Sequence, residues 1–220
     1  MTVEAEPVAG LPDPTEYGFS VVRESEIPRE HHDLVARVRE LVDAVAHTQA
    51  EPAELAAAEA TVAELTELLS RRRRDTGTLL LHRPPGGPPE YGTVTNLVAG
   101  PTNAVAPPLV MAPGADGELR GEVTLNGVYQ GPPGIVHGGW LAALLDQALG
   151  AAASAAGMPG LTANLSVDYR RPTPLHAPLT VTSRVTGTER RKVFVAAEIR
   201  HDGEVTAEGT ALMVRLAVPD

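Results

Sequence analysis

One stretch, Gly131 to Gly157, constrains the fold more than any other part of the sequence. It reads GPPGIVHGGWLAALLDQALGAAASAAG, and beyond its glycine- and proline-rich start it is apolar on nearly every helical face. A helix that is apolar all round is expected to be buried all round. The rest of the chain must therefore supply elements that surround this helix.

The predicted helix carries an acid, Asp146, near its middle. A carboxylate inside a buried helix is costly unless it is paired or kept for chemistry. At the helix start, Gly138 and Gly139 leave backbone N–H groups accessible at the positive end of the helix dipole, where an oxyanion or a phosphate binds. The segment is either a core helix with a costly acid or a core helix that carries an active site.

The sequence around the helix alternates in polarity, which is typical of strands. One strand follows the Asp116-Gly117 turn, and others are expected near 178–188, 191–201 and 204–215, the last two joined by an Asp202-Gly203 hairpin. A further strand follows the helix. Its alternation puts Ala163, Leu165, Val167 and Tyr169 on one face and Thr162, Asn164, Ser166, Asp168 and Arg170 on the other. We predict an α+β fold in which an antiparallel sheet curls around the central helix.

The N-terminal third of the sequence has the spacing of two amphipathic helices. Leu34, Val38, Leu41 and Val45 form the apolar seam of a helix over Arg29–His47, and a second helix follows Pro52. The pair suggests a helical hairpin or two helices lying on a neighbour. The second helix ends in the run Arg71–Arg74, which either complements the helix dipole or meets an anionic ligand such as the phosphates of coenzyme A.

Composition limits the class of protein. The formal net charge of -10 argues against a nucleic-acid surface. The absence of cysteine and of a signal-like N-terminus predicts a cytoplasmic protein, and Asp146 and Gln147 break the nearest approach to a membrane span. We expect a flexible arm (1–28), a helical extension (29–75), a Pro/Gly linker (76–92) and one α+β domain (93–220).

The central stretch followed by LTANLSVDYRRPTPL resembles the hotdog-fold acyl-CoA thioesterases of the phenylacetate-pathway and THEM type. Their pattern is a Gly/Pro turn, an HGG helix start, an Asp two turns into the helix, a T-A-x-L strand and an R-P-x-P-L turn. The resemblance runs from about Tyr91 to Leu216 and leaves the helical extension outside. It implies hydrolysis of acyl-CoA thioesters, with coenzyme A as part of the substrate and no other cofactor and no metal.

The resemblance also implies roles for four residues. The N–H of Gly139 or its neighbour stabilises the oxyanion, and Asp146 is a general base or a nucleophile. Thr162, sixteen positions later, orients the water or the carboxylate, and His137 holds the loop or the carbonyl. Gly139 and Asp146 are about 10.5 Å apart along the helix, so we expect each acid to serve a partner's helix start in a homodimer, with a tetramer also possible.

Other residues are candidates for binding the substrate. Gly138 lies at the helix start, and Gln130 is the amide nearest the turn, where some relatives carry a polar residue shortly before HGG. The cations that suit the phosphates of coenzyme A are Arg170, Arg171, Arg190, Arg191 and Lys192. For each cation, a solvated strand end is the alternative interpretation.

Three other functions stay open at this point. The first is a non-catalytic hotdog protein that binds acyl-CoA or an acyl carrier. The second is a hotdog dehydratase, although the sequence has no evident His/Asp hydratase pattern. The third is a structural or regulatory protein that acts through its N-terminal helices.

Overall fold

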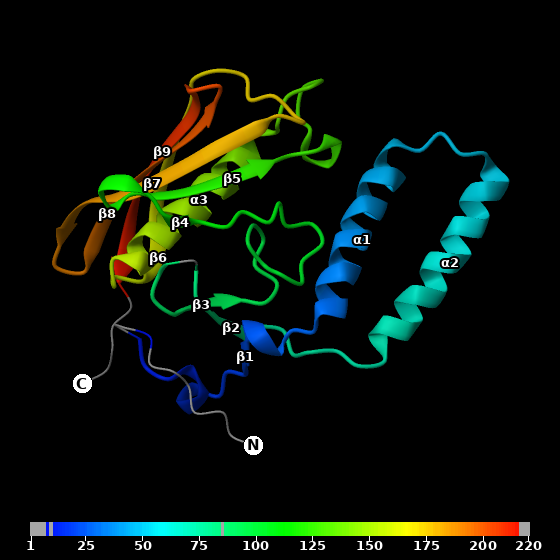
Figure 1. Cartoon of the computed structure of the whole chain (residues 1–220), viewed down its shortest axis with the longest axis horizontal. Coiled ribbons are helices and arrows are strands. Elements are labelled where there is room, and N and C mark those ends of the chain that lie inside the picture. Colours follow the sequence, from blue (N-terminus) through cyan, green and yellow to red (C-terminus); the bar gives the residue numbers. More distant parts are fainter. Residues whose placement is uncertain (1–7, 9–10, 85, 216–220) are drawn as a thin grey trace.

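The computed structural model describes residues 8, 11–84 and 86–215, and within them one long helix, α3 (Gly138–Ala155), lies against a six-stranded sheet (Figure 1). The sheet is antiparallel throughout and has the order β4-β5-β7-β8-β9-β6. Its strands are β4 (Ala112–Pro113), β5 (Leu119–Thr124), β6 (Gly160–Tyr169), β7 (Pro178–Glu189), β8 (Lys192–His201) and β9 (Glu204–Arg215). The predicted hotdog fold, a sheet wrapped around a central helix, is confirmed.

The core lies between α3 and the concave face of the sheet. Leu144, Leu145 and Leu149 are fully buried on the helix side, against Val181 and Ile199 of the sheet. Each of these leucines contributes roughly 1.5–3 kcal/mol by leaving water. The expected Asp202-Gly203 turn joins β8 to β9, and both residues have positive φ, as a tight two-residue hairpin requires.

The opposite face of α3 is open to a degree that the sequence does not predict. Ala143, Asp146, Gln147 and Gly150 are only partly buried. The expectation of a helix buried on every side is therefore wrong for the single chain, because one sheet covers one side of a helix. Because α3 is largely apolar, we expect another element or another subunit to cover this face.

Strand β6 lies at one edge of the sheet, where its inner side pairs with β9. Among the described residues, no strand pairs with its outer edge. It is ten residues long and presents Leu161 and Tyr169 to solvent. A long unprotected edge with exposed apolar side chains is a template for pairing with another chain.

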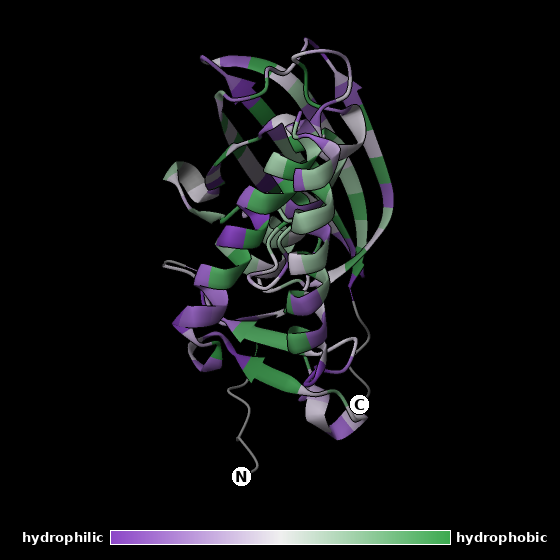
Figure 2. Cartoon of the chain, turned by 90° about the vertical axis from the view of Figure 1, so that its right-hand side faces the viewer, coloured by the Kyte–Doolittle hydropathy of each residue, from purple (hydrophilic) through white to green (hydrophobic). Residues whose placement is uncertain are grey.

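The two predicted N-terminal helices are present as α1 (Arg29–His47) and α2 (Pro52–Ser70). Val35 of α1 is buried, and the Arg39 guanidinium donates to the carbonyls of Ala106 and Asn103, which ties α1 to the loop before β4. Every residue of α2 is exposed, so this helix adds no buried side chain to the described chain. Figure 2 views these helices from the outside and shows hydrophobic residues along both, and Leu55, Leu65 and Leu69 of α2 are exposed.

A second, three-stranded sheet lies in segments that we predict as arm and linker. Its strands are β1 (Val21–Arg23), β2 (Leu79–His82) and β3 (Glu90–Thr93); β1 runs parallel to β2, and β3 antiparallel to it. Four short 3-10 turns complete the described elements: η1 (Pro14–Tyr17), η2 (Glu24–Glu26), η3 (Ala115–Gly117) and η4 (Gly127–Tyr129). Most of the arm before Leu11 lies outside the described residues. The linker therefore carries regular structure, because β1 supplies a partner strand that its own composition does not reveal.

We find no helix in the described part of the chain with both the length and the apolar character needed to cross a membrane.

Candidate functional site

A tight loop precedes α3 and fixes how the helix begins. The backbone N–H of Gly134 donates to Oε1 of Gln130 at 3.0 Å, and Gly134 has a φ of 77°, which favours glycine. A Cβ on Gly131 would lie 2.9 Å from Cα of His137, so only glycine fits there. Gln130, a predicted substrate-binding residue, thus has its amide oxygen engaged in closing this loop.

His137 is the N-cap of α3. Its Nδ1 accepts a hydrogen bond from the backbone N–H of Gly139 at 3.0 Å, which makes that nitrogen the unprotonated one. The N–H that the sequence analysis names first as an oxyanion donor is therefore occupied by the cap. The neighbouring N–H of Gly138 donates to no acceptor among the described residues. Gly138 is thus the better-placed donor for an anion at this helix start.

Asp146 and Thr162 come together as expected. Oγ1 of Thr162 donates to Oδ1 of Asp146 at 2.9 Å, and the carboxylate is half-buried on the open face of α3. This single contact fixes the carboxylate while it leaves the other oxygen available to water or substrate.

The route by which Thr162 reaches the helix differs from the predicted one. Strict alternation puts Thr162 on the face opposite Tyr169, yet Thr162 contacts Asp146 and Tyr169 contacts Gly138, both on α3. The pairing of β6 with β9 shifts register between Thr162 and Asn164. This β-bulge adds one residue to the strand and turns Thr162 to the helix side. The predicted polar face is therefore wrong for Thr162, although the predicted partner is right.

Sequence reasoning misses Tyr169 as a site residue. Its hydroxyl donates to the carbonyl of Gly138 at 2.9 Å, and its ring lies against Gly138, where an added Cβ would meet Cζ at 3.2 Å. Tyr169 is 56% exposed, so its ring has only limited apolar contact. The hydrogen bond to Gly138 therefore contributes to its orientation. A tyrosine in an alternating strand signals only an apolar face, which explains why the pattern does not reveal this contact.

Four of the five predicted phosphate-binding cations fall into two groups at opposite ends of β6 and β9. Arg170 and Arg171 lie beside the start of α3, where Arg170 pairs with Glu208 and Arg171 with Glu204. Arg191 lies at the other end, where its guanidinium donates to the carbonyl of Arg215 at 2.8 Å, and Lys192 pairs with Glu189. All four side chains are mostly exposed, and exposed ion pairs of this kind are weak enough to exchange for a phosphate.

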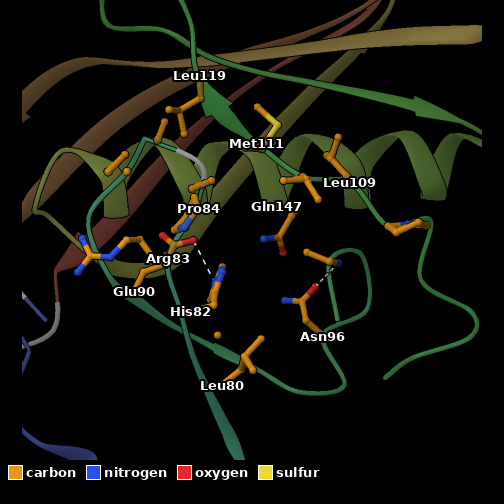
Figure 3. A pocket seen from close by; sticks show the side chains of 18 of the residues that line it. Leu80, His82, Arg83, Pro84, Glu90, Asn96, Leu109, Met111, Leu119 and Gln147 are labelled. Atoms are coloured by element: carbon orange, nitrogen blue, oxygen red, sulfur yellow. Dashed lines mark hydrogen bonds and ion pairs between the residues drawn. The ribbon is translucent and has the colours of Figure 1, made fainter. Parts of the chain in front are cut away.

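A cavity lies beside this site. It has a volume of about 720 Å³, and its lining includes Gln147 of α3 but not Asp146, Thr162 or His137. Its far wall comes from β2 and β3 (Figure 3), including His82 and Glu90, whose Nε2 and Oε1 are 3.2 Å apart. Burial raises the pKa of Glu90 to about 7 and lowers the pKa of His82. Sequence reasoning missed this pair because its two residues lie in the Pro/Gly linker.

Comparison with known proteins identifies the family. A family model described as the thioesterase superfamily matches residues 133–208. The crystal structure of protein RHA08564, a thioesterase superfamily protein, is 36% identical in sequence and has a TM-score of 0.72, and the alignment covers 84% of this chain and 94% of that one. The chain belongs to the thioesterase superfamily. The aligned share of this chain is larger than the share made up by residues 93–220. The similarity to that protein therefore includes part of the sequence before residue 93.

Curated relatives of this superfamily member match a shorter segment. The acyl-coenzyme A thioesterase THEM4 of Xenopus laevis is 43% identical over 89 residues, which are 40% of this chain and 40% of that protein. The rat THEM4 is 40% identical over 89 residues, which are 38% of its length. The matched segment thus spans about two fifths of the length of these relatives.

Proposed function

We propose that this superfamily member hydrolyses acyl-CoA thioesters to the free acid and coenzyme A, with no cofactor beyond the coenzyme A of the substrate. The observation that carries the proposal is the hydrogen bond from Thr162 to Asp146, which holds a carboxylate on the open face of the helix whose N-terminus offers an unused N–H. The matching segments of the THEM4 relatives, which are named acyl-coenzyme A thioesterases, support the choice of substrate.

The chemistry uses two groups, the backbone N–H of Gly138 and the carboxylate of Asp146. The N–H of Gly138 donates to the thioester carbonyl oxygen and stabilises the negative charge that develops on it. Asp146 takes a proton from water as the water oxygen bonds to the carbonyl carbon, and that proton passes to the sulfur as the carbon–sulfur bond breaks. In the alternative route the carboxylate itself attacks, and water then hydrolyses the anhydride.

The distance between the two ends supports a site shared by two subunits. Gly138 and Asp146 are eight residues apart on one helix, or about 12 Å, which exceeds the reach of an acid to a carbonyl held at its own helix start. The open edge of β6 offers a way to bring in a partner. Because α3 runs antiparallel to β6, two β6 strands that pair antiparallel also set the two helices antiparallel.

The bulge supports one register for this pairing. If the two-fold axis passes at Ser166, Tyr169 lies three residues from the axis. On the other side of the axis Thr162 lies four residues away in sequence, but the bulge removes one step. Tyr169 of one subunit therefore lies opposite Thr162 of the other. Tyr169 holds the helix start through the carbonyl of Gly138, and Thr162 holds Asp146. The start of one α3 therefore comes to the Asp146 of the other.

The same pairing brings the two groups of cations together. Arg170 and Arg171 of one subunit then lie near Arg191 and Lys192 of the other, and we assign the coenzyme A phosphates to this combined cluster. His137 keeps the loop in place as the helix cap, and Gln130, which is exposed, closes the loop through its amide oxygen.

Release of free thiol from a panel of acyl-CoAs tests the proposal. The wild-type chain should release coenzyme A, and Asp146→Ala should abolish the release while its melting temperature stays close to that of the wild type. Full activity in Asp146→Ala would exclude the mechanism.

A binding protein without turnover is the second candidate, and the engagement of the Gly139 N–H by His137 favours it. It predicts tight binding of acyl-CoA in calorimetry and no thiol release in the wild type.

A further inference from the structure

The 720 Å³ cavity lies between the hotdog domain and the segments that precede it, the helical extension and the linker. One wall is the alanine side of α3, with Ala151, Ala152 and Ala155. The opposite wall is made by β2, β3 and α1. The small side chains on the helix leave the space open, and the extension closes it from outside. Its volume falls within the roughly 300–1,000 Å³ typical of small-molecule sites.

Most of the side chains that line the cavity are apolar. Leu80, Leu109, Met111 and Leu119 converge on it from β2, from the loop before β4 and from β5 (Figure 3). Such walls fit a flexible hydrocarbon chain. A cavity filled only with water would leave these side chains without the contacts that usually hold an interior together.

Among the polar side chains of the wall, His82 and Glu90 form a pair with each other. The two residues are direct cross-strand partners at the ends of β2 and β3, and their side chains are only 26% and 20% exposed. Burial raises the pKa of Glu90 to about 7 and lowers the pKa of His82, so burial disfavours the charged form of each group. The pair then offers hydrogen-bond donors and acceptors without net charge. A neutral hydroxyl or carbonyl suits it better than a charged group does.

The ionisable groups around this pair come from several elements. Glu24 of η2, His32 and Arg39 of α1, and Glu118 before β5 line the same cavity. Arg39 is engaged with the carbonyls of Ala106 and Asn103, and Glu118 pairs with Arg184. Arg39 and Glu118 thus have partners of their own, whereas His82 and Glu90 contact each other within the wall of the cavity.

The cavity reaches the proposed reaction site through α3. Gln147 follows Asp146 in sequence and points into the cavity, as Figure 3 shows. Gly150 lies one turn further on, between the faces of these two residues, and a Cβ there would meet only Met213 Cε at 3.9 Å. The missing side chain leaves a path across the open face of the helix from Asp146 to the alanine side. An acyl chain whose carbonyl lies at Asp146 can follow this path.

We propose that the cavity binds the acyl part of the substrate, and that His82 and Glu90 select acyl groups that carry a neutral hydrogen-bonding group, such as a hydroxyl, far from the thioester. This inference rests on the proposed thioesterase function. Strands β2 and β3, which supply the far wall together with α1, then set the specificity of a site whose chemistry lies in the hotdog domain. An unsubstituted chain that reaches the pair displaces its water and offers no hydrogen bond in return.

The test compares acyl-CoAs in matched pairs of equal length, from hexanoyl to dodecanoyl, each with and without a hydroxyl at the terminal carbon. We expect kcat/KM to favour the hydroxylated member by about 3- to 10-fold at the lengths that reach the pair, the equivalent of one hydrogen bond. The double variant His82→Leu with Glu90→Leu replaces both partners by apolar groups and should remove the preference while it keeps the fold. The control Arg29→Ala with Asp33→Ala removes an exposed ion pair of the same extension, outside the cavity, and should keep the preference.

Calorimetry with the free acids separates this inference from the proposed hydrolysis. Titration with 8-hydroxyoctanoic acid and octanoic acid, and with their longer homologues, measures binding to the cavity without turnover. A hydroxyl preference in binding that the double variant loses supports the cavity assignment, even if no thioester is hydrolysed. Hydrolysis without a hydroxyl preference at any length, or with a preference that the double variant retains, would overturn the inference and leave the proposed function standing.

Discussion

The role of Thr162 gives a sharp prediction about catalysis. Thr162→Val keeps the shape of the side chain and removes the hydroxyl that donates to Asp146 at 2.9 Å. A hydrogen bond to a charged group contributes roughly 1.5–3 kcal/mol. If that bond holds the carboxylate in its reactive position, its loss lowers kcat by about 10- to 100-fold. KM should change little, because Thr162 contacts the acid and binds the substrate only through it.

Stability should respond far less than activity to this change. Thr162 is exposed and Asp146 is half-buried, so water can replace the lost hydroxyl, and the free energy of unfolding should fall by at most about 1 kcal/mol. Steady-state thiol release and thermal unfolding measure the two effects side by side. Thr162→Ser, which keeps the hydroxyl, is the matched control and should retain most of the activity. Wild-type kcat in Thr162→Val would refute the view that this bond positions the acid.

Two further predictions concern stability and assembly. Burial raises the pKa of Glu90 to about 7, so its protonated form stabilises the fold at low pH, and this contribution is lost as pH rises through about 7. Glu90→Gln should therefore gain stability relative to wild type by about 1–3 kcal/mol between pH 5 and pH 8 in urea unfolding, and an equal difference at both pH values would contradict the assignment. Because the chain has no cysteine, Ser166→Cys should form a disulfide-linked dimer across the proposed two-fold axis, whereas Thr210→Cys, on the neighbouring strand that pairs with Ser166, should stay monomeric in non-reducing electrophoresis. Linkage of both variants alike would exclude the β6 register.

The local patterns in the sequence predict most of the hotdog domain. Apolar spacing places α1, α2 and α3, and alternation places β5 to β9, because each of these periods reports which side of an element is buried. The spacing from Asp146 to Thr162 also predicts a pair that the structure brings into contact. These features depend on residues that lie close together in sequence or in a recognisable motif.

Features that depend on distant segments could not be predicted in this way. The pairing of β1 with β2 joins residues 21–23 to residues 79–81, and neither segment carries a pattern that predicts its partner. The bulge in β6 depends on how β9 packs beside it, so alternation assigns Thr162 to the wrong face. The hydrogen bond from Gly139 to His137 depends on the rotamer of the cap, which decides which glycine N–H is free.

The most direct test of a site shared between two subunits is complementation between two inactive variants. Asp146→Asn removes the acid, and Gly138→Val places a branched side chain against the ring of Tyr169, where even a Cβ comes within 3.2 Å, and so blocks the helix start. Each variant alone should be inactive, with folding checked by thermal unfolding.

The two variants are then refolded together in equal amounts, and thiol release by the mixture is measured. If Asp146 serves the partner's helix start, each mixed dimer contains one intact site, and thiol release should recover to about one quarter of the wild-type rate in a random mixture of two-fold dimers. If Asp146 acts within its own chain, every site in the mixture carries a defect. Rates that stay at the level of the separate variants, in a mixture where mixed dimers are demonstrated, would contradict the shared site.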